Sequence, residues 1–240
     1  MTTTRSGSRI VRWLDSRFYG SDYCDETCVF KEHIEPYLKQ ESIVLDAGCG
    51  RGLFAHDYKE RVKLLVGCDA TEQAWLNPYV HTGVVCDMQS IPFEDGYFDL
   101  IFSRWTAEHL ADPAAVFREF ARVLKAGGRI VMVTPNVHHY VALISRVSPH
   151  WLHLVVARFR GLEEEDTFRT AYRANSQIAL RRILDRTGLQ LESIEMIETR
   201  PNYLDWSAPT FLFGFFYQRL VNQLSWLAAL RVEIIFIARK

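Results

Sequence analysis

Residues 43–54, Ile-Val-Leu-Asp-Ala-Gly-Cys-Gly-Arg-Gly-Leu-Phe, set the interpretation of the whole chain. The three apolar residues that open this stretch are typical of a buried strand. Glycines at 48, 50 and 52 then suit a tight turn, because a residue without a Cβ lets a ligand approach the backbone. A helix over residues 53–60 would present free N–H groups to that ligand. The stretch predicts a strand, a ligand-binding turn and a helix, although a plain strand-to-helix turn shares the pattern.

The spacing of the glycines separates two classes of cofactor. The dinucleotide fingerprint places its third glycine three residues after the second, and that position is Leu53 in this chain. Residues 44–52, Val-Leu-Asp-Ala-Gly-Cys-Gly-Arg-Gly, instead resemble the first motif of the class I S-adenosylmethionine-dependent methyltransferases. In that family the turn passes under the methionine part of the cofactor. The resemblance therefore assigns five residues to the cofactor site: Asp46, Gly48, Cys49, Gly50 and Gly52.

A second apolar run, residues 64–69, is predicted to be a strand that ends in Asp69. A carboxylate about twenty residues beyond a glycine turn can accept both hydroxyls of a ribose. The resemblance names Asp69 as this ribose ligand, with Ala70 beside it. The alternative is that Asp69 caps a helix that begins near Glu72.

A third strand is expected over residues 84–88, and it also ends in an acidic residue. By the resemblance, Asp87 and the backbone N–H of Met88 contact adenine. Residues 91–103 resemble the segment of the family that leads into the fourth strand. Ser103 and Trp105 near the end of that strand, and Tyr19 from the N-terminal region, complete the expected cofactor site. For most aromatic residues of the N-terminal region, packing of a helix onto the sheet is the favoured alternative.

Strands and helices continue to alternate through the predicted strands 129–135, 189–196 and 231–238. This alternation predicts an α/β protein with a doubly wound, seven-stranded Rossmann-like sheet. The resemblance implies that the sheet is mostly parallel, with an antiparallel last strand and helical insertions after strands five and six. Ligands bind at the carboxyl ends of such strands, where five residues of this chain fall: Gly48, Asp69, Asp87, Ser103 and Thr134.

We expect one methyltransferase domain over residues 1–240. Its predicted parts are a disordered start (1–8), an N-terminal helical lid (10–40), a cofactor-binding core (41–135) and two substrate-side insertions (136–175 and 200–230).

Four residues are candidates for catalysis: His109, His138, His139 and Tyr140. A histidine suits proton transfer near neutral pH. Each also has a structural alternative: His109 could hold its loop in place, Tyr140 could begin a helix over residues 141–147, and one histidine could cap that helix. The acidic run 163–166 lacks the ligand spacing of a calcium loop, so we predict no metal site.

Net charge and cysteine content limit which binding partners and which cellular location we expect for this chain. The net charge of −1 gives no indication of nucleic-acid binding. Five cysteines show no metal-ligand spacing and leave an odd one unpaired, and a reducing cytoplasm is the simplest setting. The polar N-terminus lacks the apolar core of a signal peptide.

The apolar segment 211–230 is interrupted by polar residues, so we expect no stable membrane span. It could cover the substrate pocket, form a homodimer or touch a membrane surface. We favour the pocket or the dimer, because Arg219 alone does not supply the basic face that membrane binding usually requires.

These patterns predict a cytoplasmic enzyme that transfers a methyl group from S-adenosylmethionine to a small-molecule acceptor and releases S-adenosylhomocysteine. Family frequency favours an oxygen acceptor over nitrogen or carbon. A catalytically silent subunit that binds the cofactor is the main alternative. A nicotinamide-dependent oxidoreductase is disfavoured by the glycine spacing.

Overall fold

The computed structural model describes residues 8–20, 22–147 and 170–240, so the predicted disordered residues 1–7 and the acidic run 163–166 lie outside the described residues. The chain divides into two compact units. A sheet unit comprises residues 30–135, 170–195 and 234–240. A helical unit comprises residues 1–29, 136–169 and 196–233.

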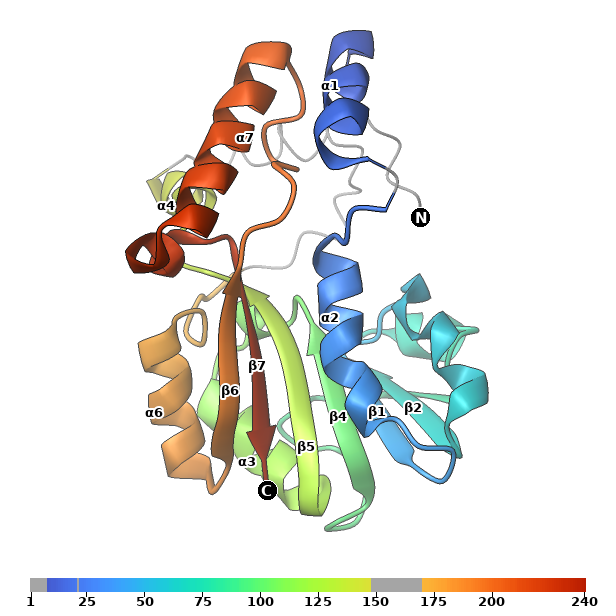
Figure 1. Cartoon of the computed structure of the whole chain (residues 1–240). Coiled ribbons are helices and arrows are strands. Elements are labelled where there is room, and N and C mark those ends of the chain that lie inside the picture. Colours follow the sequence, from blue (N-terminus) through green and yellow to red (C-terminus); the bar gives the residue numbers. More distant parts are fainter. Residues whose placement is uncertain (1–7, 21, 148–169) are drawn as a thin grey trace. The chain divides into compact units, whose positions relative to one another are not determined.

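Seven strands form one sheet in the order β3-β2-β1-β4-β5-β7-β6 (Figure 1), which confirms the predicted fold class. Strands β1 to β5 pair in parallel. Strand β7 is antiparallel, since the amide of Gly127 at the start of β5 donates to the carbonyl of Lys240, which follows the end of β7. The strands are β1 (Ile43–Ala47), β2 (Leu64–Asp69), β3 (Thr82–Val85), β4 (Phe98–Arg104), β5 (Leu124–Pro135), β6 (Gln190–Ile197) and β7 (Glu233–Arg239).

Strand β1 lies at the point where the strand order reverses. It pairs with β2 on one side, where Leu45 faces Val66, and with β4 on the other, where Leu45 faces Ile101. In doubly wound sheets, ligands bind beyond the carboxyl ends of the strands at such a reversal. The turn after β1 therefore begins at the expected ligand site.

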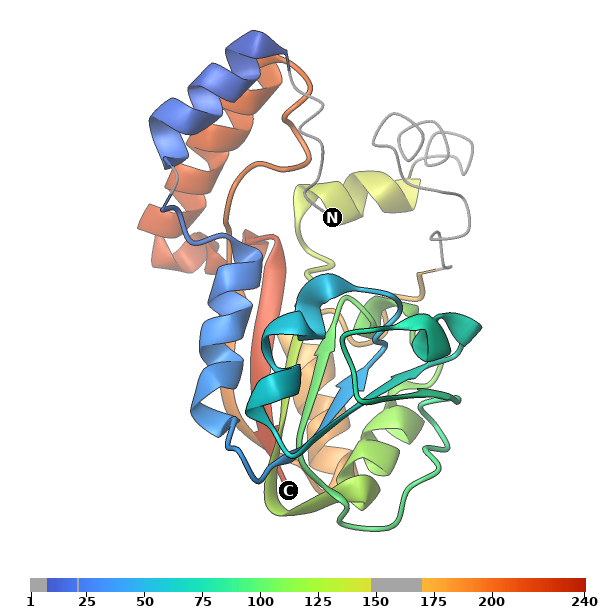
Figure 2. The same ribbon diagram turned by 90° about the vertical axis from the view of Figure 1, so that its right-hand side faces the viewer.

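Helices α3 (Pro113–Val123) and α6 (Gln177–Thr187) cover one face of the sheet, and the later turns of α2 (Glu26–Ile34) cover the other (Figures 1 and 2). The sequence predicts that Ser176 caps this helix and that Gly188 ends it, and α6 confirms both ends. Ser176 caps its N-terminus by accepting from the amide of Ala179, and Gly188 ends it in the left-handed conformation at φ 75°. The other short helical turns are η1 (Glu35–Tyr37), η4 (Glu72–Leu76) and η5 (Ala107–His109).

The helical segment predicted over residues 53–60 forms, but not as one regular α-helix. The chain forms two 3₁₀ helices there, η2 (Leu53–Asp57) and η3 (Lys59–Arg61). Phe54 stacks on Phe30 of α2 at 5.3 Å between ring centroids and meets Phe102 of β4 edge-on at 5.7 Å. Packing of these aromatic rings outweighs the weak intrinsic preference for a regular α-helix.

The helical unit contains α1 (Arg9–Tyr19), α4 (Tyr140–Val147), α7 (Ala208–Gln223) and η7 (Ser225–Leu230). Helices α1 and α7 lie side by side (Figure 2), and Phe18 stacks on Phe215 at 4.3 Å. Ser8, at the end of the predicted disordered segment, accepts from the amide of Val11 and caps α1. Among the described residues, no helix has the length and apolarity needed to cross a membrane.

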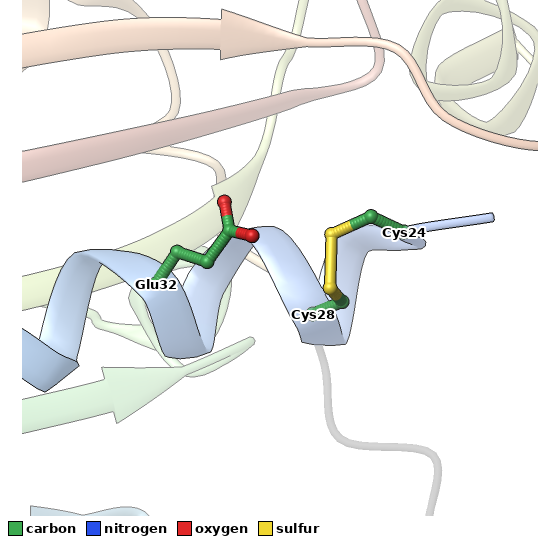
Figure 3. A group of neighbouring side chains, drawn as sticks. All are labelled: Cys24, Cys28 and Glu32. Atoms are coloured by element: carbon green, nitrogen blue, oxygen red, sulfur yellow. A yellow bond between two sulfur atoms is a disulfide. The ribbon is translucent and has the colours of Figure 1, made fainter. Parts of the chain in front are cut away.

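A disulfide joins Cys24 and Cys28 at the start of α2 (Figure 3), with 5.2 Å between their Cα atoms. The expectation of reduced cysteines is therefore wrong for this pair. Four residues of separation bring the two sulfurs together once α2 forms its first turn, and Glu32 follows one turn later. Cys49, Cys68 and Cys86 are free thiols.

Candidate cofactor and acceptor site

The glycine turn after β1 requires glycine at two of its three positions. Gly48 and Gly50 have φ values of 81° and 45°, in the left-handed region that other residues rarely adopt. A Cβ on Gly48 would also collide with the side chain of Thr106, 2.9 Å from its Cγ2. Gly52 has a φ of −65°, and a Cβ there would meet only the Cys49 carbonyl at 3.6 Å.

Hydrogen bonds from neighbouring elements hold this turn in one conformation. The amides of Gly48 and Cys49 both donate to the carbonyl of Cys68 in β2, at 2.8 and 3.0 Å. The side-chain amide of Asn77 donates to the carbonyl of Gly50 at 3.0 Å. Cys49 is buried, and this burial raises the pKa of its thiol. Cys49 thus contributes backbone geometry rather than a reactive thiolate.

Asp69, the predicted ribose ligand, lies at the end of β2 against this turn. Its Oδ2 accepts from the amide of Gly50 at 3.0 Å, and its Oδ1 accepts from the amide and hydroxyl of Thr71 at 2.9 and 2.8 Å. A carboxylate offers about four acceptor positions, and the described residues occupy three of those of Asp69. The N-cap alternative is not what forms, because Thr71 occupies the N-cap of η4. Ala70 is exposed beside Asp69.

Asp46 in β1 is buried next to the glycine turn. Its pKa is raised to about 8, mainly by burial and also by the charge of Asp69, while the guanidinium of Arg104 opposes both effects. A cationic group bound at the turn would restore the charge on this carboxyl. The residues at the turn therefore fit a ligand that combines a positively charged group with a ribose.

The sequence did not identify Arg104, the last residue of β4. Its guanidinium lies 3.8 Å from the ring centroid of Trp105 and 5.4 Å from that of Phe54. Trp105 adopts a φ of 52°, a costly conformation for a bulky residue and one that often marks a functional site. An exposed aromatic ring and a cation thus lie at the carboxyl end of β4.

The predicted third strand, residues 84–88, is displaced toward the C-terminus, because β3 already begins at Thr82. Strand β3 ends at Val85, and Asp87 and Met88 lie in the turn that follows. The carboxylate of Asp87 accepts from the amide of Gln89 at 2.9 Å, so an Asx turn replaces strand pairing. Asp87 is exposed and Met88 is half-buried. Both still follow β3 at its carboxyl end, which is the edge expected to bind adenine.

Ser103 binds the sheet itself. Its buried hydroxyl donates to the carbonyl of Ala47 at 2.6 Å and ties β4 to β1. The hydroxyl proton of Ser103 therefore takes part in this hydrogen bond. A ligand could use only its oxygen as an acceptor.

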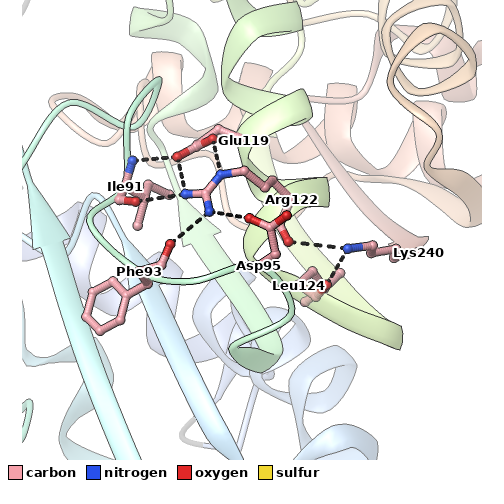
Figure 4. A network of polar contacts seen from close by, with 7 residues as sticks. All are labelled: Ile91, Phe93, Asp95, Glu119, Arg122, Leu124 and Lys240. Carbon is pink, nitrogen blue, oxygen red and sulfur yellow. Dashed lines mark hydrogen bonds and ion pairs between the residues drawn. The ribbon is translucent and has the colours of Figure 1, made fainter.

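Arg122 of α3 fixes the loop that follows Asp87 (Figure 4). Its guanidinium donates to Glu119 twice, at 2.8 and 2.7 Å, to Asp95 at 2.7 Å, and to the carbonyls of Ile91 and Phe93. Glu119 in turn accepts from the amide of Ile91 at 2.7 Å. This network holds residues 91–95 against α3 and so sets where the chain returns from β3 to β4.

A second feature that sequence reasoning missed is a chain of buried polar groups at the carboxyl end of β5. Asn175 donates to Thr134 Oγ1 at 2.7 Å, and Thr134 donates to Glu108 Oε2 at 3.3 Å. Burial raises the pKa of Glu108 to about 7. Asn175 Oδ1 is buried and has no hydrogen-bond partner among the described residues. In the sequence, the place of Thr134 at the end of a predicted strand and that of Glu108 beside His109 are the signals for these groups.

His109 lies beside this chain of groups. Its Nε2 is 3.9 Å from Glu108 Oε1, and its amide donates to the carbonyl of Thr106 at 3.0 Å. Its ring is partly exposed. The geometry is compatible with both roles expected for His109, proton transfer and support of the loop.

Four predicted site residues belong to the helical unit. Tyr19 is buried in the α1–α7 core, edge-on to Tyr23 at 4.8 Å. His138 is exposed, and Tyr140 begins α4. His139 is buried, its Nδ1 accepts from the amide of Val141, and its Nε2 lies 3.6 Å from Glu198 Oε2. Burial lowers the pKa of His139 to about 4 and raises that of Glu198 to about 8.

The glycine turn, its two neighbouring carboxylates and the strand order agree with a comparison against protein families. A family described as a methyltransferase domain, of type 11, matches residues 45–132. Residues 45–132 are a class I S-adenosylmethionine-dependent methyltransferase domain. The resemblance found in the sequence is thereby confirmed, and S-adenosylmethionine is the cofactor of this class.

The methyltransferase domain has relatives among curated proteins. An uncharacterized methyltransferase of Bacillus subtilis, YcgJ, is 35% identical over 107 residues, which cover 40% of this chain and 41% of the relative. A ubiquinone biosynthesis O-methyltransferase of Pseudomonas paraeruginosa is 32% identical over 102 residues, which cover 39% of this chain and 44% of the relative. The match thus spans less than half the length of each of these two relatives.

Solved structures share the fold over most of the chain. A geranyl diphosphate C-methyltransferase from Streptomyces coelicolor, in complex with S-adenosyl-L-homocysteine among other ligands, aligns at a TM-score of 0.52 with 20% identity and covers 87% of this chain and 77% of its own. The [4+2]-cyclase SpnF aligns at a TM-score of 0.56 with 16% identity, and the alignment covers 89% of this chain and 80% of the cyclase. At these identities the likeness shows the fold alone.

Proposed function

We propose that this chain transfers the methyl group of S-adenosylmethionine to a small-molecule acceptor, with oxygen favoured as the accepting atom. The observation that carries the proposal is the contact of the glycine turn with Asp69, because it joins the two elements that would hold methionine and ribose. S-adenosylmethionine, when bound, supplies an activated methyl group on its sulfonium. The protein then mainly has to align donor and acceptor.

On the cofactor side, we propose roles for the residues around the glycine turn. The turn receives the methionine part, and Asp46 faces its ammonium group. Asp69 accepts from ribose, while Asp87 and the amide of Met88 bind adenine. The supporting observations are the left-handed glycines, the position of Asp69 against the turn and the place of Asp87 after β3. The expected contributions of Gly52, Ala70, Ser103, Trp105 and Tyr19 remain part of the same proposal.

On the acceptor side, proton removal from a hydroxyl needs a base whose pKa lies near the working pH. Glu108 has this property because it is buried, and His109 lies beside it. An oxygen acceptor is also consistent with the relative named as an O-methyltransferase, while a structural neighbour is named as a C-methyltransferase. His138 and Tyr140 stay as proposed acceptor contacts. The burial of His139 favours a structural role for that residue.

Calorimetric titration with S-adenosylhomocysteine, with NAD as the control ligand, tests the cofactor. We expect micromolar binding of the first and no binding of NAD. Radiolabelled methyl transfer to panels of phenols, amines and activated carbon acids then tests the acceptor. Cofactor binding with no transfer to any class would favour the silent subunit, and the cyclase with the same fold shows that methyl transfer does not follow from the fold alone. Binding of NAD alone would favour an oxidoreductase.

The cytoplasm remains our proposed location. The three free cysteines support a reducing setting, whereas the Cys24–Cys28 disulfide argues against it. The number of thiols that react in the unreduced protein decides between a reducing and an oxidising setting.

A further inference from the structure

Helix α7 presents apolar side chains on two opposite faces. Phe211, Gly214 and Val221 are buried on the face that packs within the helical unit. Phe213, Phe216 and Leu220 follow each other at intervals of three and four residues and therefore share the other face. Phe213 is 63% exposed and Phe216 is 65% exposed. Large aromatic rings that are aligned on one solvent-exposed face of a helix indicate an interaction surface.

Neighbouring segments of the helical unit extend the set of exposed apolar residues. Trp13 of α1 is 63% exposed, and Ile10 lies one turn before it. Trp206 just before α7 and Trp226 in η7 are also exposed. Tryptophan and phenylalanine are enriched where a protein meets the boundary between water and lipid, because their rings tolerate both environments.

Within the three helices that carry most of these residues, the charged side chains are mostly basic, while Asp205 lies next to Trp206. The helices α1, α7 and η7 contain four arginines, Arg9, Arg12, Arg17 and Arg219, and one acid, Asp15. Asp15 forms an ion pair with Arg200 at 3.2 Å. Within α7 itself, Arg219 is the only basic residue. Packing of α1 beside α7 (Figure 2) brings three further arginines to the same element.

We propose that α1, α7 and η7 form an interfacial element through which the chain docks on an anionic lipid bilayer. The aromatic residues enter the headgroup region, and the arginines contact lipid phosphates. A second copy of the chain is a poorer occupant, since a symmetric contact would bring like charges together. The element lies on the membrane rather than across it, because none of the described helices could span a bilayer. The proposal does not depend on the proposed enzymatic activity.

Flotation of the full chain with vesicles tests this proposal. We expect binding to vesicles of phosphatidylcholine mixed with phosphatidylglycerol, little binding to phosphatidylcholine alone, and release at high salt. Changing Arg9, Arg12 and Arg17 together to glutamine should weaken partitioning by roughly a hundredfold. The matched control changes Arg181, Arg182 and Arg186, three exposed arginines of α6, to glutamine and should leave binding unchanged.

The aromatic contribution has its own pair of variants. Trp13→Ser and Phe216→Ser should each weaken binding several-fold, whereas Trp75→Ser, at the same 63% exposure in η4, should not. Circular dichroism confirms that each variant folds. Equal loss in both arginine sets, or no binding to any vesicle, would overturn the proposal. A dimer in light scattering that Phe216→Ser dissociates would show instead that a second copy covers this face.

Discussion

The amide of Gly50 donates to Asp69 Oδ2 over 3.0 Å, so the turn after β1 and the end of β2 hold each other in place. Asp69→Ala removes a charged acceptor and leaves this amide without its partner. A hydrogen bond to a charged group contributes about 1.5–3 kcal/mol, so affinity for S-adenosylhomocysteine should fall by roughly ten- to a hundredfold. Asp69→Asn keeps an oxygen acceptor for the amide of Gly50, so its affinity for S-adenosylhomocysteine should fall less. Calorimetry measures both, with the exposed Asp185→Ala in α6 as the control. Unchanged affinity in Asp69→Ala would remove Asp69 from the cofactor site.

Two glycines of the same turn should respond differently to the same change. Gly48→Ala forces a left-handed φ on alanine and drives a methyl group into Thr106. We expect it to lower the free energy of unfolding by about 2–4 kcal/mol. Gly52→Ala meets no close neighbour and should change it by less than about 1 kcal/mol. Urea denaturation compares the two. Similar losses in both would mean that the turn does not have the described backbone.

Asp46 should make stability depend on pH. Its pKa is raised in the folded state to about 8, so the folded protein binds a proton that the unfolded chain releases near pH 4. The contribution of Asp46 to the free energy of unfolding is therefore fully present below about pH 4. It is lost as pH rises toward 8, by up to about 1.4 kcal/mol per pH unit. Asp46→Asn should flatten this decline in urea denaturation between pH 5 and pH 8. A steeper decline in the variant would contradict the assignment.

The network around Arg122 should matter more for stability than an ordinary surface arginine. Arg122→Ala removes donors to two carboxylates and two carbonyls. We expect a loss of about 1–3 kcal/mol in the free energy of unfolding, because the ion pairs are partly exposed and solvent screens them. Arg118→Ala, on an exposed position of the same helix, is the control and should cost less than about 0.5 kcal/mol. Equal effects would show that the loop does not depend on Arg122.

The disulfide predicts a thiol count. The denatured protein should react with a thiol reagent at Cys49, Cys68 and Cys86 alone, and at all five cysteines after reduction. Cys24→Ser should release one further reactive thiol without reduction, at Cys28. Five reactive thiols in the unreduced protein would show that Cys24 and Cys28 are reduced, which would favour the cytoplasmic location.

Local pattern was sufficient for the order and type of most elements. The apolar runs that became β1, β2 and β4 are continuous because both faces of a parallel sheet are buried, and this makes them recognisable. The ends of α6 could be predicted because Ser176 and Gly188 act through bonds to their own helix. The glycine turn was recognisable because its left-handed positions favour glycine, although hydrogen bonds to Cys68 and from Asn77 hold its conformation.

Elements that depend on distant partners could not be predicted in this way. Residues 53–61 form 3₁₀ helices because Phe54 packs against Phe30 and Phe102, which lie far away in sequence. Glu108 gained its raised pKa from burial beside Thr134 and Asn175, and a lone glutamate in a sequence carries no such signal. The basic character of the α7 surface depended on α1, about two hundred positions earlier in the chain.

The cofactor class and the alternation of strands and helices therefore follow from the sequence, because glycine conformation and apolar periodicity act over a few neighbouring residues. Burial, charge state and surface composition are collective properties that exist only after distant segments pack together. For this reason Asp46, Glu108 and the arginines of α1 acquired their significance in the folded chain.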